Sequence, residues 1–278
     1  MPELPEVETM RRGIAPVVGG AVVGIERPRC TRRPIAINPA FPTLRRRMLG
    51  RTITATRRIG KRVILDFDDG DSLVIEPRMT GLVTLAEPPT RDHVRLLLHI
   101  HGDSPHELRF WDRRGLGTVR LVRADEFDQR YGLAKIGPDA LAISAADLRG
   151  RMATSRREIK VALLDQRAVA GIGNLYASEI LHLARVHPQT SCGELSNAQW
   201  KAIHAATRKV LAAAIRYEGS TLGDGTYRNA LNQSGGYQNH HRVYGRASKP
   251  CPRCSTPVER IVQAQRSTFF CPRCQSPA

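Results

Sequence analysis

The chain has 278 residues, and 43 Lys and Arg against 26 Asp and Glu give it a formal net charge of +17. This length allows two domains of ordinary size and a small appended module. The charge favours a polyanionic partner, although a merely solvated basic surface produces the same count. Six cysteines are too few for a disulfide-built scaffold. No apolar run approaches the roughly 20 residues of a membrane helix.

The first half of the chain is predicted to be rich in β-strands. A first helix is expected from about Pro5 to Ile14, followed by short apolar runs that include 63–67, 72–75 and 94–100. Asp69-Gly70-Asp71 is typical of a hairpin turn between two of these runs. We therefore expect an N-terminal domain over residues 1–135, built as a β-sandwich or barrel with one helix.

Helical spacing replaces the strand pattern in the second half. Apolar residues recur with a helical period from Ala145 to Glu218, after a linker over 126–144. We assign a helical domain to residues 145–235, with a Gly-rich polar segment at its end, and a small module to 244–278. The predicted fold class is α+β.

Four of the six cysteines form two Cys-x-x-Cys pairs near the C-terminus, separated by sixteen residues. This spacing is typical of a zinc ribbon in which two knuckles are joined by a β-hairpin. Four thiolates fill a tetrahedral shell, so the zinc is predicted to be structural. The ligands would be Cys251, Cys254, Cys271 and Cys274. Cys30 and Cys192 lack a partner motif and are expected to be ordinary packed thiols.

The N-terminus has both a structural and a chemical interpretation. Pro and acidic residues in Pro2-Glu3-Leu4-Pro5-Glu6 favour the first turn of a helix. Removal of Met1 would also expose the secondary amine of Pro2. An α-amino group titrates near pH ~8, so it is a usable nucleophile toward a sugar carbon, with Glu3 beside it as acid or base.

Five segments in order resemble the formamidopyrimidine-DNA glycosylase and endonuclease VIII family. They cover essentially the whole chain: Pro2 to Thr9, Ile59-Gly60-Lys61-Arg62, Gly171 to Glu179, Tyr244-Gly245-Arg246 and Ala264 to Cys271. The resemblance implies an N-terminal β-sandwich, a helix-two-turns-helix motif and a zinc hairpin. It also implies a bifunctional glycosylase and AP lyase that excises oxidised purines by base excision repair of double-stranded DNA.

The resemblance assigns a role to each catalytic residue. Pro2 would form a Schiff base at C1′, Glu3 would protonate the opening sugar, and Lys61 would assist β-elimination. Arg266 on the zinc hairpin would grip phosphates and assist δ-elimination. A base inside a duplex must be extruded before such chemistry, so the protein must also fill the gap that the base leaves.

Further residues match DNA contacts of the family. Met79 corresponds to the wedge that enters the gap, although a core methionine has the same pattern, and Arg114 corresponds to the arginine that pairs with the orphaned base. If the match to the family motif shifts by one residue, Arg113 takes the place of Arg114 as the base contact. Asn174 would present its amide and backbone N–H groups to phosphates. Arg91 and Arg156 are the other predicted contacts.

Several positions depart from the family pattern. Leu116 replaces a common phenylalanine wedge, and Glu76-Pro77-Arg78 replaces His-Leu-Gly. Arg91 stands where a histidine is common, and Ser155 where a lysine is common, although Arg156 beside it supplies a charge. Residues 234–242 match the flexible lesion-contacting loop of the family, but a disordered connector has the same composition. These departures concern lesion choice and affinity more than the reaction.

Two alternatives remain open at this point. An endonuclease VIII-like glycosylase would act on oxidised pyrimidines, whereas Tyr244-Gly245-Arg246 and Gln265-Arg266 favour the oxidised-purine branch. A non-catalytic DNA-damage binder would need no free amine. A zinc-ribbon transcription factor is disfavoured because no sequence-reading helix with a dimer pattern is present. We expect a monomer in the bacterial cytoplasm or nucleoid, without a membrane partner and without a signal peptide.

Overall fold

The computed structural model describes residues 2–103, 106–222, 225, 227–229 and 233–276. These residues form two compact units. The N-terminal unit comprises residues 1–132 and a returning segment, 217–238, and the C-terminal unit comprises 133–216 and 239–278. Residues 217–235 had been predicted to belong to the helical domain. A hydrogen bond from the main-chain N–H of Ser220 to the Glu6 carboxylate holds the returning segment to the N-terminal unit.

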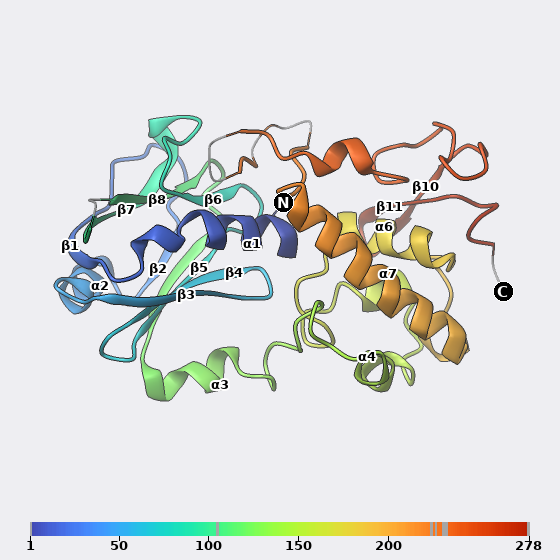
Figure 1. Cartoon of the computed structure of the whole chain (residues 1–278), viewed down its shortest axis with the longest axis horizontal. Helices are drawn as coiled ribbons and strands as arrows, with labels where there is room; N and C mark the ends of the chain where they lie inside the picture. The colour runs from blue at the N-terminus through green and yellow to red at the C-terminus, as the bar shows by residue number, and fades with distance from the viewer. Residues whose placement is uncertain (1, 104–105, 223–224, 226, 230–232, 277–278) are drawn as a thin grey trace. The chain divides into compact units, whose positions relative to one another are not determined.

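The N-terminal unit contains two sheets and the helix α1 (Figure 1). Among the described residues, one sheet has the strand order β1-β7-β8-β6 and the other β2-β9-β5-β4-β3. The strands of the first sheet are β1 Ala21–Glu26, β7 Val94–His101, β8 His106–Asp112 and β6 Gly81–Thr84. Those of the second are β2 Ala36–Asn38, β9 Thr118–Val122, β5 Ser72–Glu76, β4 Arg62–Phe67 and β3 Ile53–Ile59. This architecture confirms the predicted sandwich.

The described residues of this unit also form three α-helices and a large apolar core. The helices are α1 Leu4–Gly13, α2 Phe41–Met48 and α3 Phe127–Tyr131. Val7, Met10 and Ile14 are buried in one hydrophobic cluster with residues of both sheets. The turn predicted at Asp69-Gly70-Asp71 joins β4 to β5, and Phe67 N–H donates to the Asp71 carbonyl at 2.9 Å. Burial of the apolar face of each strand stabilises this arrangement.

The described residues of the C-terminal unit form four α-helices and a hairpin (Figure 1). The helices are α4 Ala145–Met152, α5 Ile159–Ala162, α6 Asn174–Ala184 and α7 Asn197–Arg216, and the hairpin strands are β10 Glu259–Gln263 and β11 Arg266–Phe270. Helix α6 packs against α5, α7 and β11.

Short 3-10 helices occur along the whole chain. They are η1 Ala15–Val17, η2 Arg91–His93, η3 Ala124–Glu126, η4 Cys192–Glu194 and η5 Tyr237–His240. Within the described residues, no helix is both long and apolar enough to cross a membrane.

Candidate active site and DNA-binding surface

The predicted nucleophile lies at the start of α1. Pro2 and Glu3 are both buried, and Glu3 is the N-cap of the helix. Glu3 N–H donates to Glu6 Oε2 at 2.9 Å in a capping box, and Glu6 Oε1 accepts from Ser220 N–H at 2.9 Å. A capping box satisfies helix donors that would otherwise lack partners. The helix start is therefore held in place from both sides. Met1, whose removal the chemistry requires, lies outside the described residues.

Lys61 lies in the tight turn between β3 and β4, next to Gly60, whose φ of 56° favours glycine. Arg58 connects this turn to α1. Its Nε donates to Glu8 Oε2 at 3.2 Å, and its Nη1 donates to the Gly60 carbonyl at 2.9 Å. Because one guanidinium binds both elements, the turn that carries Lys61 has a fixed position relative to the helix that begins at Glu3.

The carboxylate of Glu8 also binds Arg11 and Arg12 from its own helix. Burial by itself raises the pKa of Glu8, but the hydrogen bonds from Arg11 and Arg12, with the charges of Arg11 and Arg58, lower it below its usual value. Glu8 therefore stays ionised in the neutral range and keeps its contact with Arg58.

Met79 and Arg114 lie in two loops that one buried carboxylate joins. Asp112 is fully buried, and its Oδ1 accepts from the Thr80 hydroxyl and from Arg114 N–H, the latter at 3.2 Å. Its Oδ2 accepts from Gly117 N–H at 2.8 Å. The side chains of Met79 and Arg114 are both exposed. The loops that carry the predicted wedge and the predicted base contact thus share one buried support.

Leu116 and the segment 76–78 depart from the family pattern in these same loops. Leu116 is half-buried, so it offers an apolar contact without an aromatic face. Arg78 has a φ of 56° and binds Glu76 at 3.3 Å, which places an ion pair at the base of the turn that carries Met79.

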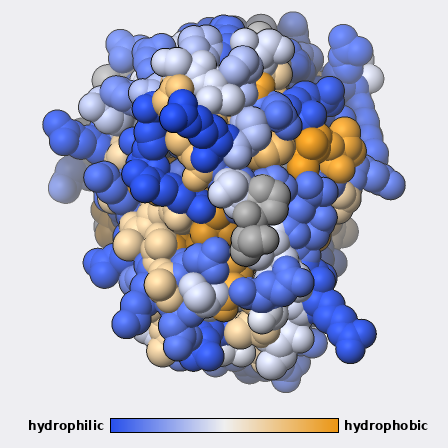
Figure 2. Space-filling model, turned by 90° about the vertical axis from the view of Figure 1, so that its right-hand side faces the viewer, coloured by the Kyte–Doolittle hydropathy of each residue, from blue (hydrophilic) through white to orange (hydrophobic). Residues whose placement is uncertain are grey.

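The remaining cationic contacts are surface residues. Arg91 is exposed in η2 and binds Glu87 at 3.3 Å, and Arg156 is exposed before α5. Figure 2 shows the face that contains the C-terminal elements, where hydrophilic side chains cover most of the surface and apolar patches are small. Arg91 and Arg156 as specific DNA contacts stay predictions.

Asn174 is the first residue of α6, and its amide is held within the C-terminal unit. Its Oδ1 accepts from Lys160 Nζ at 2.6 Å, and its Nδ2 donates to the Ser267 carbonyl at 2.9 Å. Lys160 is fully buried. The prediction that Asn174 binds phosphate therefore depends on its second amide proton and on the backbone at the start of α6. The same amide fixes the zinc hairpin against α6.

The four predicted zinc ligands lie together. Their ligand atoms all fall within 4.8 Å of one another. The sulfurs of Cys254 and Cys271 are 3.4 Å apart, and those of Cys251 and Cys274 are 4.0 Å apart. A tetrahedral Zn–S shell with bonds of ~2.3 Å requires separations of about 3.8 Å. The residues fit one structural zinc ion, as predicted.

A histidine supports this metal site from α6. His182 is buried, and its Nε2 lies 3.4 Å from Cys251 Sγ, so the imidazole is placed to donate to that thiolate. Burial lowers the pKa of His182 to about 4, which keeps the ring neutral. Gln275 also contributes, because its Oε1 accepts from Cys271 N–H at 3.0 Å.

Arg266 is exposed beside the turn of the hairpin, directly opposite Gln263. The two turn residues, Ala264 and Gln265, have φ values of 45° and 60°, although neither is glycine. Left-handed backbone of this kind costs about 1–2 kcal/mol per residue. The hydrogen bond from Gln263 Nε2 to Glu158 Oε2, at 2.7 Å, stabilises the hairpin next to this turn and offsets part of the cost.

The loop predicted to contact the lesion is partly described. Gly235 N–H donates to Thr221 Oγ1 at 2.9 Å, and Gly236 N–H donates to the Tyr217 carbonyl at 2.8 Å. A side chain at Gly235 would lie 2.4 Å from the Gly219 carbonyl oxygen, which explains the glycine. Its role as a lesion reader stays a prediction. Residues 230–232, just before it, lie outside the described part of the chain.

Three family models match consecutive parts of the chain. Residues 1–119 match the formamidopyrimidine-DNA glycosylase N-terminal domain, and 136–225 match the H2TH domain of the same enzyme. Residues 248–277 match a zinc finger found in FPG and IleRS. The formamidopyrimidine-DNA glycosylase of Chloroflexus aggregans is 43% identical over 99% of this chain and 98% of its own length. The chain belongs to the formamidopyrimidine-DNA glycosylase family.

Solved structures of the formamidopyrimidine-DNA glycosylase family agree with this assignment. The MutM (FPG) protein of Thermus thermophilus is 36% identical, with a TM-score of 0.86 and 100% of each chain covered. A variant of the Lactococcus lactis FPG in complex with Fapy-dG-containing DNA is 32% identical, with a TM-score of 0.88 over 99% of this chain and 100% of that chain. The resemblance stated from the sequence is confirmed.

The residues that hold the predicted site loops in place were not predicted from the sequence. They are Arg58, Asp112, Lys160 and Gln263, each a buried or half-buried polar group bound to another element. Only Asp112 carried a usable signal, because an Asp two residues before Arg114 and three before a glycine favours a side-chain-stabilised turn. Cys192 is a buried thiol, as expected, but Cys30 is half-buried.

Proposed function

We propose that this protein is a bifunctional DNA glycosylase and AP lyase of base excision repair that excises oxidised purines, including 8-oxoguanine and formamidopyrimidines. The observation that carries the proposal is the buried Pro2-Glu3 pair at the start of α1, in a chain that its family relatives match along its full length. The Fapy-dG-containing DNA bound to the Lactococcus lactis relative supports the substrate class.

The reaction begins at the secondary amine that removal of Met1 exposes. The nitrogen of Pro2 attacks C1′ of the extruded nucleotide, the bond from C1′ to the base breaks, and the base leaves with a proton. Glu3 protonates the sugar ring oxygen as the ring opens, which leaves a cationic Schiff base between C1′ and Pro2. Burial of Glu3 beside the amine supports this role, because a proton donor must lie within reach of the reacting atoms.

Strand cleavage follows from the acidity that the Schiff base gives to C2′. Loss of a C2′ proton breaks the C3′–O bond, and the 3′ phosphate leaves. A second elimination then releases the 5′ phosphate. We propose that Lys61 assists the first elimination. We propose that Arg266 binds the negatively charged phosphates and assists the second elimination. The tie of the Lys61 turn to α1 through Arg58 supports the first assignment.

DNA binding is assigned to Met79, Arg114, Arg91, Arg156 and Asn174. Met79 would fill the gap left by the base, and Arg114 would bind the partner base. The attachment of both loops to Asp112, through the Thr80 hydroxyl and through Arg114 N–H, supports a concerted entry of both side chains into the duplex. We further propose that the protein acts as a monomer in the bacterial cytoplasm or nucleoid. Sedimentation with and without DNA tests the monomer, because a dimer would double the mass of the free protein.

The decisive experiment is covalent trapping. The processed protein is incubated with duplex DNA that carries 8-oxoguanine opposite cytosine, borohydride is added, and the cross-link is located by peptide mass mapping. We expect the cross-link at Pro2, its loss in Pro2→Gly, and strongly reduced trapping in Glu3→Gln. Oxidised pyrimidines and abasic DNA complete the panel. If none of these substrates is trapped while binding persists, the protein is a damage binder and not an enzyme.

A further inference from the structure

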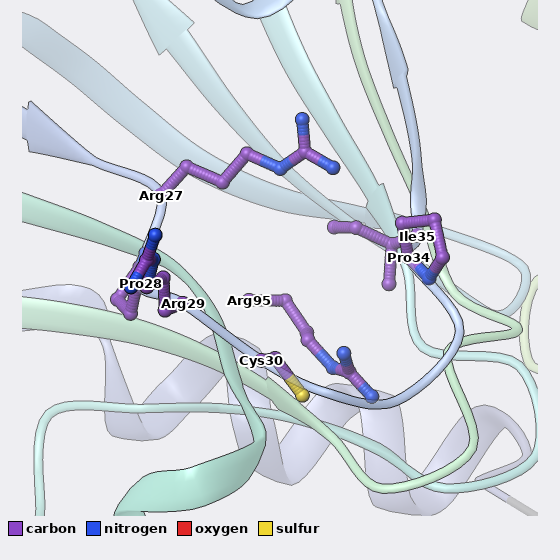
Figure 3. A pocket seen from close by; sticks show the side chains of 7 residues that line it. All are labelled: Arg27, Pro28, Arg29, Cys30, Pro34, Ile35 and Arg95. Carbon is purple, nitrogen blue, oxygen red and sulfur yellow. The ribbon is translucent and has the colours of Figure 1, made fainter.

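A small cavity in the N-terminal unit is lined by three arginines. Its volume is about 250 Å³, and it lies between the segment that follows β1 and the start of β7 (Figure 3). The lining side chains are Arg27, Pro28, Arg29, Cys30, Pro34, Ile35 and Arg95. Neither the catalytic assignment nor the predicted DNA contacts include any of them.

Arg95 is directed into this place by a β-bulge. In the pairing of β7 with β8, Val94 opposes Trp111 and Leu96 opposes Phe110, so Arg95 is the extra residue of β7. A bulge redirects one side chain out of the strand alternation. The side chain is only 3% exposed, and its Nε donates to the Asp112 carbonyl at 2.7 Å.

The charges at this cavity lack counterions among the residues that the structure describes. No ion pair in the described part of the chain involves Arg27, Arg29 or Arg95. The neighbouring Glu26 binds His99 at 2.7 Å, and the carboxylate of Asp112 is occupied by Thr80 and by main-chain N–H groups. A buried charge is costly unless it is paired, so an anion bound beside the Arg95 guanidinium would offset this cost.

The cavity adjoins the loop that carries Arg114. The Arg95 side chain binds the carbonyls of Asp112 and Arg113, which begin that loop. Gly115 has a φ of 65°, and a Cβ there would lie 2.0 Å from the Arg33 carbonyl oxygen. The backbone at Arg33, which follows the cavity segment, is therefore packed against the Arg114 loop.

We propose that Arg27, Arg29 and Arg95 form a phosphate subsite that binds one backbone phosphate of the DNA strand opposite the lesion. This inference rests on the proposed function, because it uses the assignment of Arg114 to the partner base. A guanidinium presents paired N–H donors that match phosphate oxygens, and the cavity is large enough for a phosphodiester. The subsite would anchor the strand whose base Arg114 contacts.

The salt dependence of binding tests the number of phosphates involved. The affinity for duplex DNA with a tetrahydrofuran abasic analogue is measured against KCl concentration for wild type and for Arg27→Gln/Arg29→Gln. Each lost phosphate contact lowers the slope of log K against log[salt] by about 0.9, so we expect a slope change near one and about tenfold weaker binding. The matched control is Arg45→Gln/Arg46→Gln, two exposed arginines of α2. An equal loss in this control overturns the proposal.

Neutral methylphosphonates locate the phosphate. Each phosphate near the lesion is replaced in turn, on either strand. At one position on the opposite strand, we expect the neutral linkage to weaken DNA binding by wild type. The same linkage should not weaken DNA binding by the Arg27→Gln/Arg29→Gln variant any further. Additive losses at every position, or a coupled position on the damaged strand, would refute the assignment.

Cys30 offers an independent probe inside the cavity. It is half-buried, whereas Cys192 is buried and its pKa is raised to about 11 by burial, so Cys192 stays unreactive. A sulfonate-bearing methanethiosulfonate reagent attached to Cys30 should weaken DNA binding, a methyl reagent should do so less, and Cys30→Ser should abolish the difference. Duplex DNA should protect Cys30. Protection by inorganic phosphate but not by the duplex would contradict a DNA phosphate.

Trapping of Pro2 on abasic DNA separates this proposal from the enzyme assignment. At saturating DNA, the cavity variants should cross-link as wild type does, because the subsite does not touch the reacting atoms. If wild type is not trapped, the proposed function fails. If wild type is trapped and the cavity variants bind DNA with unchanged affinity and salt slope, only the phosphate subsite fails.

Discussion

The loops around Asp112 and the zinc hairpin both present an exposed arginine, but different forces hold them. The Arg114 loop lies at the end of a strand whose apolar residues belong to a large core cluster, and a buried carboxylate completes it. The hairpin that carries Arg266 packs on a small cluster of Val243, Val258 and two buried zinc ligands, and it buries Phe270 as well. A large core makes a loop rigid through packing, whereas a small hairpin needs a metal cross-link to reach the same order.

Zinc removal should have the largest effect and should affect the two regions unequally. Structural zinc sites contribute about 10 kcal/mol or more of apparent binding free energy, so we expect chelation or Cys254→Ser to unfold the hairpin. Hydrogen exchange should show lost protection over 259–270 and retained protection over 63–75. Equal loss in both stretches would contradict the independence of the two regions.

The two tryptophans allow each unit to be followed separately. Trp111 lies in the N-terminal unit and Trp200 in the C-terminal unit, and both are buried. Trp200→Phe leaves a reporter in the first unit, and Trp111→Phe leaves one in the second. These variants serve as the readouts for the predictions on stability that follow.

Asp112→Ala should disturb the N-terminal unit alone. It leaves the donors of Thr80 and Gly117 without their acceptor and leaves Arg114 N–H with Thr80 Oγ1 alone, which we expect to cost about 2–4 kcal/mol of unfolding free energy. Urea unfolding followed at Trp111 measures this loss. Thr80→Val, which removes one donor, should cost less. Loss of preference for the base opposite the lesion should accompany Asp112→Ala, and an unchanged preference would show that Arg114 is positioned in another way.

Acid should weaken the C-terminal unit before the N-terminal unit. Burial, with the charges of Arg246 and His240, lowers the pKa of His241 to about 4, although a hydrogen bond with Tyr244 opposes this shift. Between pH 6.5 and about 4, the folded state therefore binds fewer protons than the unfolded state. The contribution of neutral His241 to the free energy of unfolding is complete above pH 6.5 and falls as the pH decreases toward 4. The pKa of Glu8 is lowered from 4.5, so its contribution is lost only below that value.

The comparison of His241→Gln with wild type isolates this effect. Thermal unfolding of the Trp111→Phe background between pH 7 and pH 4 should have a shallower pH dependence in His241→Gln. His240→Gln, at the adjacent and more exposed histidine, is the control. A slope in His241→Gln equal to that of wild type would show that His241 is not held neutral in the folded protein.

The smallest expected change is a gain in stability at the hairpin turn. Gln265 has a φ of 60°, and glycine adopts this conformation without steric cost. Gln265→Gly should stabilise the hairpin by about 1 kcal/mol or less, because part of the gain is offset by the greater freedom of glycine in the unfolded chain. Zinc-dependent unfolding measures it, and Gln265→Ala, which keeps the strain, should produce no gain.

Much of the fold and of the chemistry could be predicted from local patterns. The turn at Asp69-Gly70-Asp71, the four zinc ligands and the helical period after Ala145 follow from rules that act over a few residues. The return of residues 217–238 to the N-terminal unit could not be predicted, because Ser220 and Glu6 are far apart in the chain and meet only after folding.

The sequence by itself determined which chemical groups are present: a proline at position 2 beside a glutamate, four thiols at metal spacing, and arginines in excess over acids. Only the tertiary structure decided which polar groups hold them in place. Arg58, Asp112 and Lys160 act through partners on other elements, and the bulge at Arg95 directs a charge into a cavity that no local pattern indicates. The physical reason is that burial and long-range hydrogen bonding depend on chain segments that sequence spacing does not bring together.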